Sequence, residues 1–194
     1  MTELFADLPA DVPARLRARL VADAERDGIL DVAYRTVDTP VGSLLLAATP
    51  AGLLRVVYST TGHDMALADL AERVSPRILH APARLDAVVR QLEEYFTGRR
   101  RTFDVPLDLR LATGFRRAVL SHLSDIGYGR TESYAEVAAA AGSPRAVRAV
   151  GTACATNPVP VVLPCHRVVR SDGTSGGYVG GAAAKQALLT LEAA

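Results

Sequence analysis

The sequence predicts an α/β protein of the α+β kind, in which a small domain with an antiparallel sheet precedes a mostly helical domain. Three observations support this class: short β-like runs between turn residues in the first half, helical periodicity in the second half, and a glycine turn between two short helices there. We expect residues 1–30 to form an N-terminal appendage, residues 31–108 the first domain and residues 109–194 the second. Since 49% of the 194 residues are hydrophobic, both domains can bury a core.

The appendage and the first domain follow from local patterns. Residues 14–27 form a helical segment with Leu16 and Leu20 on one face. Three β-like runs come next, separated by Pro-Val-Gly and Pro-Ala-Gly turns, and predict an antiparallel meander. The runs cover residues 32–37, 43–48 and 53–58. An amphipathic helix is expected over residues 85–96, because apolar residues recur there at spacings of three, four and seven.

The second domain follows an extended linker, residues 99–111, and begins with a helix over residues 115–126. Ser133 and Glu136 then form a capping box, which satisfies the free backbone N–H groups at the start of the next helix. After Gly142, a Ser-Pro pair provides an N-cap and a first-turn proline, which predicts another helix over residues 144–153. Two short helices joined by a glycine turn are typical of DNA-binding domains.

Charge is distributed unevenly, although the net charge is only +1. Residues 137–171 contain no Asp or Glu, and they include five basic residues. These are Arg145, Arg148, His166, Arg167 and Arg170. Between the arginines, Ala149 and Gly151 leave little bulk, so the helix can approach a groove closely, and the absence of Asn, Gln and Glu predicts contacts to phosphates rather than to base edges. The alternative is a pair of packed helices with a solvated arginine face.

The segment Pro164-Cys165-His166-Arg167 places a thiol beside an imidazole at the end of an apolar run. The thiolate is the reactive form of cysteine, so a reactive cysteine needs a base or a positive charge nearby, and His166 and Arg167 are candidates for these roles. The alternative is a buried cysteine that packs as a small apolar residue. With only Cys154 and Cys165, the chain has too few cysteines for a disulfide framework or a cysteine-based zinc site, and we expect no metal and no cofactor.

The last helix, residues 182–192, has Lys185, Leu188, Leu189 and Glu192 on one face, so Glu192 is expected to point inward. A buried carboxylate needs a partner. His166 is the obvious partner, in the logic of a carboxylate that orients an imidazole and an imidazole that takes the proton of a thiol. The alternative is a frayed, exposed terminal glutamate.

The apolar runs are short and interrupted by charged residues, glycine or proline, so no membrane span is expected. The first residues also lack the basic and apolar segments of a secretory signal. We expect a cytoplasmic protein.

From Tyr128 to Glu192 the sequence closely resembles the O6-alkylguanine-DNA alkyltransferases, also called methylated-DNA–protein-cysteine methyltransferases. The resemblance rests on Ser133-Tyr134, the segment 148–151, Asn157-Pro158, the segment 164–168 and the pattern Gly-Tyr-x-Gly-Gly followed by Lys, Leu-Leu and Glu. It implies an RNase H-like first domain and a winged-helix-like second domain with the helix-turn-helix. It also implies irreversible transfer of an alkyl group from O6-alkylguanine in duplex DNA, and less well from O4-methylthymine, after base flipping. No cofactor is implied, and a monomer is expected, with cooperative assembly on DNA left open.

The resemblance assigns roles to individual residues. Cys165 is the alkyl acceptor, His166 a base that acts through a water, Glu192 the residue that holds His166, and Asn157 the brace of the turn before the active site. Arg148 fills the space of the flipped nucleotide. Tyr134 displaces a phosphate or bonds the extruded guanine, with Lys185 near its hydroxyl. The remaining expected contacts bound the base pocket or touch DNA: Val168, Tyr178, Val179, Arg145, Ala149 and Gly151.

Three departures from the family pattern leave the substrate range open: Leu120 replaces a common tryptophan, Val147 a common alanine, and Val179 a frequent serine or glycine. Two other functions fit the sequence less well. A relative that binds lesions without transfer would lack the cysteine that this chain keeps, and a cysteine hydrolase would not explain the helix-turn-helix.

Overall fold

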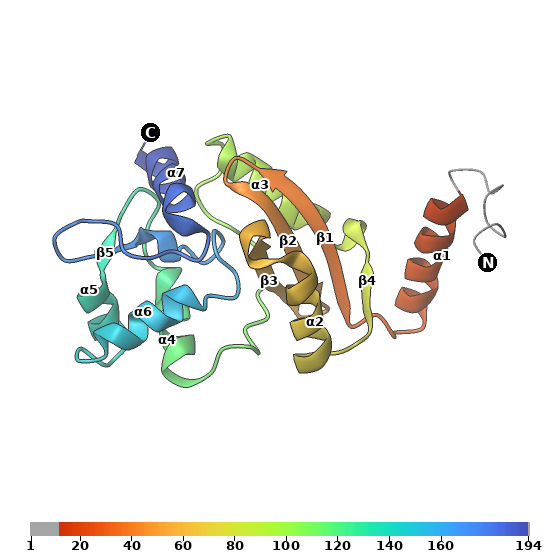
Figure 1. Cartoon of the computed structure of the whole chain (residues 1–194), viewed down its shortest axis with the longest axis horizontal. Coiled ribbons are helices and arrows are strands. Elements are labelled where there is room, and N and C mark those ends of the chain that lie inside the picture. Colours follow the sequence, from red (N-terminus) through yellow and green to blue (C-terminus); the bar gives the residue numbers. More distant parts are fainter. Residues whose placement is uncertain (1–11, 194) are drawn as a thin grey trace.

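Residues 12–193 of the chain are described by the structure, a computed structural model, and the first eleven residues of the expected appendage lie outside this range. The two domains lie side by side, and helix α1 (Val12–Arg26) lies beyond the far edge of the first domain (Figure 1). Among these residues, no helix is long and apolar enough to cross a membrane. A cytoplasmic location stays a prediction.

The first domain is built on a four-stranded sheet with the order β3-β2-β1-β4. Strands β1 (Val32–Thr39), β2 (Gly42–Thr49) and β3 (Gly52–Tyr58) form the predicted antiparallel meander. Strand β4 (Ile78–His80) pairs with β1 in parallel, and helix α2 (His63–Arg73) precedes it. The sequence analysis missed both, because β4 has only three residues and α2 buries a single short row of apolar side chains.

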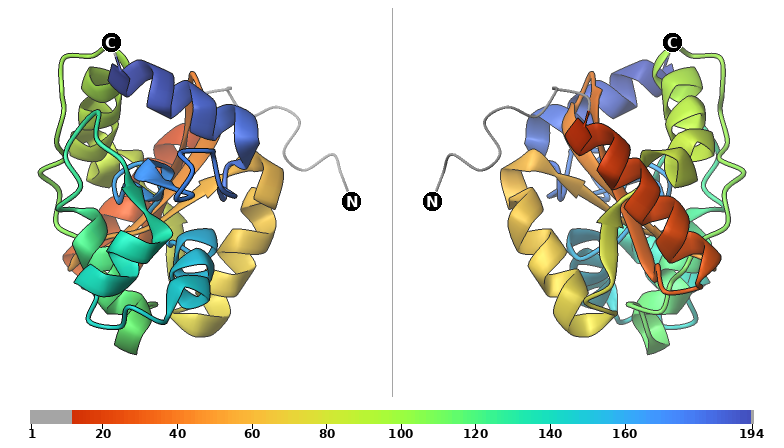
Figure 2. Two further views of the ribbon diagram at one scale, coloured as in Figure 1. Left: turned by 90° about the vertical axis from the view of Figure 1, so that its left-hand side faces the viewer. Right: turned by 90° about the vertical axis from the view of Figure 1, so that its right-hand side faces the viewer.

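Both faces of the sheet are covered, which explains the unbroken apolar run in β2. Leu44 and Leu46 face a core that includes helix α3 (Asp86–Phe96), whereas Leu45 and Ala47 face α2. Figure 2 shows α2 and α3 on opposite sides of the sheet. The α3 core continues into the second domain, so the two domains share one hydrophobic core.

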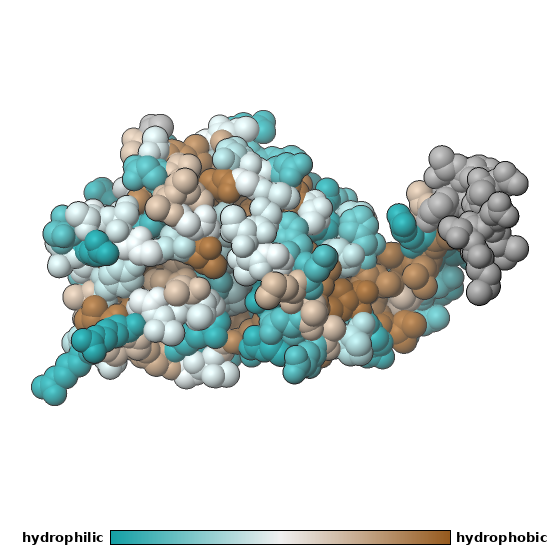
Figure 3. Space-filling view, in the orientation of Figure 1, coloured by the Kyte–Doolittle hydropathy of each residue, from teal (hydrophilic) through white to brown (hydrophobic). Residues whose placement is uncertain are grey.

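Helix α1 contacts the sheet through few residues. Val21 and Ala24 pack against Leu30, Ala33 and neighbouring residues of β4. The predicted face of Leu16 and Leu20 points to solvent, with 59% and 55% of each residue exposed. Figure 3 shows apolar residues gathered on the surface where α1 lies beside the sheet.

The linker is extended, as expected, and it is bound to the edge of β3. The Leu53 N–H donates to the Pro106 carbonyl (2.8 Å), and the Asp108 N–H donates to the Leu53 carbonyl (2.9 Å). Gly52 is required at this approach, because a Cβ there would lie 2.3 Å from the Pro106 oxygen. The linker therefore fixes the first domain relative to the second.

The second domain contains helices α4 (Gly114–Leu123), α5 (Tyr134–Ala140), α6 (Val147–Ala155) and α7 (Gly181–Ala193). Strands β5 (Glu132–Ser133) and β6 (Val168–Val169), which the sequence analysis missed, form a short parallel pair, and a 3-10 turn, η3 (Cys165–Arg167), precedes β6. The helix-turn-helix of α5 and α6 and the C-terminal helix confirm the predicted architecture.

The start of α5 confirms the capping box, and the start of α6 corrects a prediction. The Glu136 N–H donates to Ser133 Oγ (3.2 Å), and the Ser133 N–H donates to the Glu136 carboxylate (2.6 Å). Helix α6, in contrast, begins at Val147 rather than Pro144. The Ala146 N–H donates to the Ser143 carbonyl (2.8 Å), so the intervening residues form a turn and Ser143 is not the N-cap.

Candidate active site

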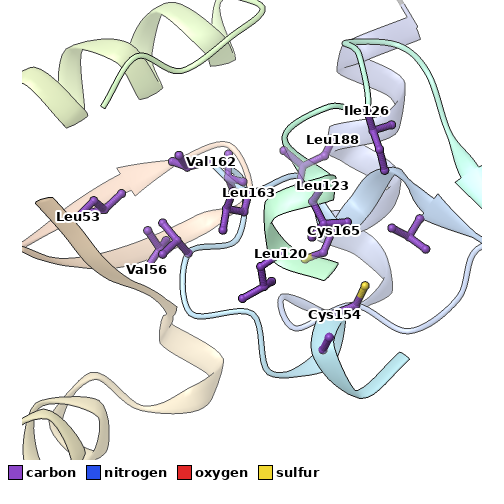
Figure 4. Close-up of a cluster of buried hydrophobic side chains, with 14 of the residues drawn as sticks. Leu53, Val56, Leu120, Leu123, Ile126, Cys154, Val162, Leu163, Cys165 and Leu188 are labelled. Atoms are coloured by element: carbon purple, nitrogen blue, oxygen red, sulfur yellow. The ribbon is translucent and has the colours of Figure 1, made fainter. Parts of the chain in front are cut away.

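Cys165 begins the η3 turn, directly after a buried turn, residues 159–164, in which the Leu163 N–H donates to the Val159 carbonyl (2.8 Å). The residue is 2% exposed. Figure 4 shows it in a cluster that includes Leu120, Leu123 and Cys154. The acceptor expected from the sequence is therefore held in an apolar, buried position.

Asn157 organises the turn that leads to Cys165. Its Nδ2 donates to Cys165 Sγ (3.1 Å) and to the Leu163 carbonyl (2.8 Å), while its Oδ1 accepts from the Val159 N–H (3.0 Å). Within the same turn, Val161 has φ 74°, a left-handed conformation that costs a β-branched residue about 1–3 kcal/mol. The Asn157 bonds hold the backbone in this strained turn and place the sulfur.

The thiol of Cys165 is neutral in the unliganded protein. Burial raises its pKa to about 11, although the hydrogen bond from Asn157 and the charge of Lys185 act in the opposite direction. A neutral thiol is a poor nucleophile. Reaction at neutral pH therefore requires a base that takes the proton.

His166 lies next in the chain and is fully buried. Its Nε2 lies 2.9 Å from Glu192 Oε1, and its Nδ1 is buried without a hydrogen-bond partner among the described residues. Burial lowers the pKa of His166, against the opposing effect of Glu192. A neutral imidazole with its proton on Nε2 satisfies the Glu192 contact, and it leaves the Nδ1 lone pair free to accept a proton.

Glu192 points inward from α7, as the helix periodicity predicted, and its side chain is only 1% exposed. Oε1 accepts from Tyr95 Oη (2.6 Å), His166 Nε2 and Arg167 Nη2 (2.9 Å). Oε2 accepts from Arg167 Nε (2.8 Å) and the Gly129 N–H (3.2 Å). Burial alone would raise the pKa of Glu192, but the hydrogen bonds from His166 and Arg167 lower it to about 2. The carboxylate stays ionised and orients the imidazole.

The position of Arg167 corrects a prediction. The sequence placed its charge beside the sulfur, but the guanidinium binds both oxygens of Glu192 and also donates to the Ile126 carbonyl. The planar guanidinium group can donate two parallel hydrogen bonds to a carboxylate, and a single sulfur atom cannot accept them in this geometry. Arg167 therefore acts on the carboxylate of the site and not directly on the thiol.

Tyr95 is the site residue that the sequence analysis missed, because it belongs to α3 in the first domain. The helical pattern identified it only as a core residue. It is fully buried, and its hydroxyl donates to Glu192 across the domain boundary. A buried tyrosine needs a hydrogen-bond partner for its hydroxyl, and this requirement was the one sequence signal that could have identified Tyr95 as a site residue.

The residues expected to contact DNA lie on the outer side of α6 and the turn before it. Arg145, Arg148 and Ala149 are exposed and Gly151 is half-buried, whereas the opposite face packs into the core through Val150 and its neighbours. None of these side chains contacts the thiol. They form a small-residue and arginine surface, as the sequence predicted.

The residues expected around the base lie close to the site. Tyr134 packs over Gly176, where a Cβ would lie 2.2 Å from its hydroxyl. The rings of Tyr178 and His166 meet edge to face, with 6.2 Å between centroids. Lys185 is fully buried and donates to the Val168 carbonyl (2.6 Å), and within residues 12–193 no hydrogen bond joins it to the Tyr134 hydroxyl.

The fold and the site define a two-domain DNA-binding protein with a buried thiol, imidazole and carboxylate beside a helix-turn-helix. Residues 32–109 match the ribonuclease-like domain of 6-O-methylguanine DNA methyltransferase, and residues 114–194 match its DNA-binding domain. The chain therefore belongs to this family, and the resemblance noted from the sequence is confirmed. It is an enzyme of the methylated-DNA–protein-cysteine methyltransferase class.

Two named relatives are similar in sequence to this chain over most of their own length. A methylated-DNA–protein-cysteine methyltransferase of Mycobacterium tuberculosis is 40% identical over 167 residues, which cover 83% of this chain and 92% of that protein. The constitutive enzyme of Bacillus subtilis is 39% identical over 147 residues, 76% of this chain and 86% of that protein.

Solved structures give the same result. The crystal structure of the M. tuberculosis O6-methylguanine methyltransferase has a TM-score of 0.73 at 39% identity and covers 84% of this chain and 93% of that one. A structure of the M. tuberculosis protein in complex with DNA has a TM-score of 0.71 at 38% identity and covers 83% of this chain and 92% of that one.

Proposed function

We propose that this protein repairs O6-alkylguanine in duplex DNA by moving the alkyl group to the sulfur of Cys165. The observation that carries the proposal is the buried set of Cys165, His166 and Glu192, in which one imidazole nitrogen is held by an ionised carboxylate and the other has no hydrogen-bond partner within residues 12–193. This arrangement suits proton removal from a neutral thiol.

The proposed step balances without a cofactor. His166 Nδ1 takes the thiol proton through a bridging water, and the thiolate attacks the alkyl carbon. The new S–C bond forms as the C–O6 bond breaks, and the electron pair of that bond goes to the guanine. The proton on His166 then passes to the ring of the guanine anion, which leaves intact guanine, a neutral imidazole and a thioether at Cys165.

Access to the base requires that the nucleotide leaves the duplex. The outer side of α6 is suited to this role, since its small residues allow close approach and Arg148 is exposed and free to enter the stack. Arg145, Ala149 and Gly151 would contact the backbone or the groove. Tyr134, Val168, Tyr178 and Val179 would bound the extruded base, and Asn157 would brace the acceptor turn.

The reaction should occur once per molecule. A thioether is a stable product, and among the described residues no group is placed to hydrolyse it. We also propose transfer from O4-methylthymine, because it presents the same kind of alkyl–oxygen bond. This transfer should be slower, because the thymine ring is smaller than the guanine ring. A monomer is sufficient for this chemistry, since every proposed group belongs to one chain.

The chain offers a matched control for the test, because Cys154 is a second buried cysteine, 3% exposed. Excess protein is incubated with a duplex that contains one O6-methylguanine, and the peptides are analysed by mass spectrometry. We expect one methyl group on Cys165 and none on Cys154. Cys165→Ser should abolish transfer, whereas Cys154→Ser should retain it. An unmodified Cys165 after repair would refute the proposal, and lesion binding without any transfer would indicate a binding protein instead.

A further inference from the structure

A glycine-rich loop, residues 176–180, lies against the active site and carries Tyr178 and Val179. The first domain touches this loop through Tyr58, the last residue of β3. The hydroxyls of Tyr58 and Tyr178 lie 3.0 Å apart, and their rings meet edge to face with 5.9 Å between centroids. Tyr58 is only 2% exposed and Tyr178 is half-buried, so a partly buried hydrogen bond joins the loop to the other domain.

The fit between Tyr58 and the loop requires glycine. A Cβ on Gly180 would lie 2.5 Å from Cζ of Tyr58, and a Cβ on Gly176 would lie 2.2 Å from the hydroxyl of Tyr134. The loop is thus contacted by a tyrosine at each end, one from each domain. Burial raises the pKa of Tyr58 to about 12, so its hydroxyl keeps its proton at physiological pH and can donate.

An interdomain cleft of about 300 Å³ lies behind the loop. Its lining includes Val179 of the loop, Tyr58, and Asn157, which donates to the acceptor sulfur. Val179 therefore borders open space on the side of the first domain. If the loop were released, it could move into this cleft and away from Cys165, which lies near Tyr178.

We infer that Tyr58 is a specificity-determining residue, whose hydroxyl holds Tyr178 and the loop in place and so limits the size of the alkyl group that reaches Cys165. The inference rests on the proposed function. Tyr58 does not touch the reacting atoms. It acts as a positioning residue through Tyr178, and the interdomain cleft is the space into which the loop would move to admit a larger alkyl group.

The test compares single-turnover transfer from two otherwise identical duplexes, one with O6-methylguanine and one with O6-benzylguanine. Tyr58→Phe removes the hydroxyl and keeps the ring, and it should raise the ratio of benzyl to methyl rates at least fivefold. Tyr34→Phe is the matched control, because Tyr34 is also in the first domain but contacts His80 instead of the loop. It should leave the ratio unchanged. Equal losses of both rates in Tyr58→Phe would show a merely structural role and overturn the inference.

Two further variants keep the inference falsifiable if Tyr58→Phe folds poorly. Tyr178→Phe removes the same bond from the side of the loop and should raise the ratio by itself, and in a double-mutant cycle with Tyr58→Phe the two effects should not add, because the two hydroxyls form one bond. Ala155→Leu adds bulk to the wall of the cleft and should lower the ratio. An unchanged ratio in Ala155→Leu, or additive effects in the cycle, would contradict the inference. Transfer by Cys165→Ser would instead refute the proposed function itself, so the two failures can be told apart.

Discussion

The two domains contribute to the active site in different ways. The C-terminal domain holds the Cys165 thiol, the imidazole and the carboxylate, all within the segment from Asn157 to Glu192. The N-terminal domain provides none of these groups, yet its Tyr95 binds the carboxylate and its Tyr58 binds the loop beside the thiol. The proposed chemistry thus uses groups of one domain, whereas the geometry of the site depends on both.

The shared core explains why the N-terminal domain can act at this distance. Side chains of the sheet and of α3 belong to the same hydrophobic cluster as those of α4, α5 and α6. Close packing across the boundary fixes the orientation of α3 relative to α7, and the Tyr95 hydroxyl can then meet Glu192 at 2.6 Å. Since the reacting groups belong to the C-terminal domain, changes there should affect transfer most.

The largest effect is expected for Glu192→Gln. The amide cannot neutralise the buried Arg167 and cannot accept all five hydrogen bonds, so we expect a loss of about a hundredfold in transfer rate and of about 3–5 kcal/mol in unfolding free energy. Glu136→Gln makes the same chemical change at an exposed capping box that tolerates glutamine, and it should retain activity. Single-turnover kinetics and urea unfolding measure both quantities. Equal behaviour of the two variants would contradict the role of Glu192.

A smaller effect is expected for Tyr95→Phe in the N-terminal domain. The ring stays, but Oε1 of Glu192 loses one of its three donors, so we expect transfer to slow about tenfold. Tyr128→Phe is the control, because that hydroxyl donates to the Leu191 carbonyl (3.1 Å) and not to the carboxylate. A normal transfer rate in Tyr95→Phe would show that the C-terminal domain alone forms the active site, and it would contradict a contribution from the N-terminal domain.

The last effect concerns stability and not the transfer rate: it is a pH dependence of the unfolding free energy that comes from the C-terminal groups. The pKa of His166 is lowered in the folded protein, so the unfolded chain binds more protons below its ordinary value of about 6.5, and the unfolding free energy should fall as the pH drops below that value. Glu192, with its pKa lowered to about 2, adds a second loss of about 3 kcal/mol as the pH falls from about 4.5 toward 2. Urea unfolding across this range tests both. The loss in the lower range should be absent in Glu192→Gln.

Much of this architecture could be predicted from local patterns. The three meander strands, the capping box at Ser133 and the inward face of Glu192 each depend on spacing within one segment. The start of α6 was predicted three residues early, because the competing turn at Ser143 is favoured by the same residues that favour an N-cap. Strand β4 depends on pairing with β1, and three residues carry too little pattern to show it.

The sequence by itself determined the kind of chemistry, since the adjacent thiol and imidazole, the helix-turn-helix and the C-terminal glutamate are all visible in short motifs. Only the tertiary structure decided how these groups are held. The partners of Glu192 include Arg167, 25 residues away, and Tyr95, 97 residues away, and Tyr58 meets Tyr178 over 120 residues. Periodicity shows which face of a helix is buried, but packing between elements decides which buried side chains meet. Cys165, which the sequence identified as the candidate nucleophile, therefore lies in a site whose geometry depends on both domains.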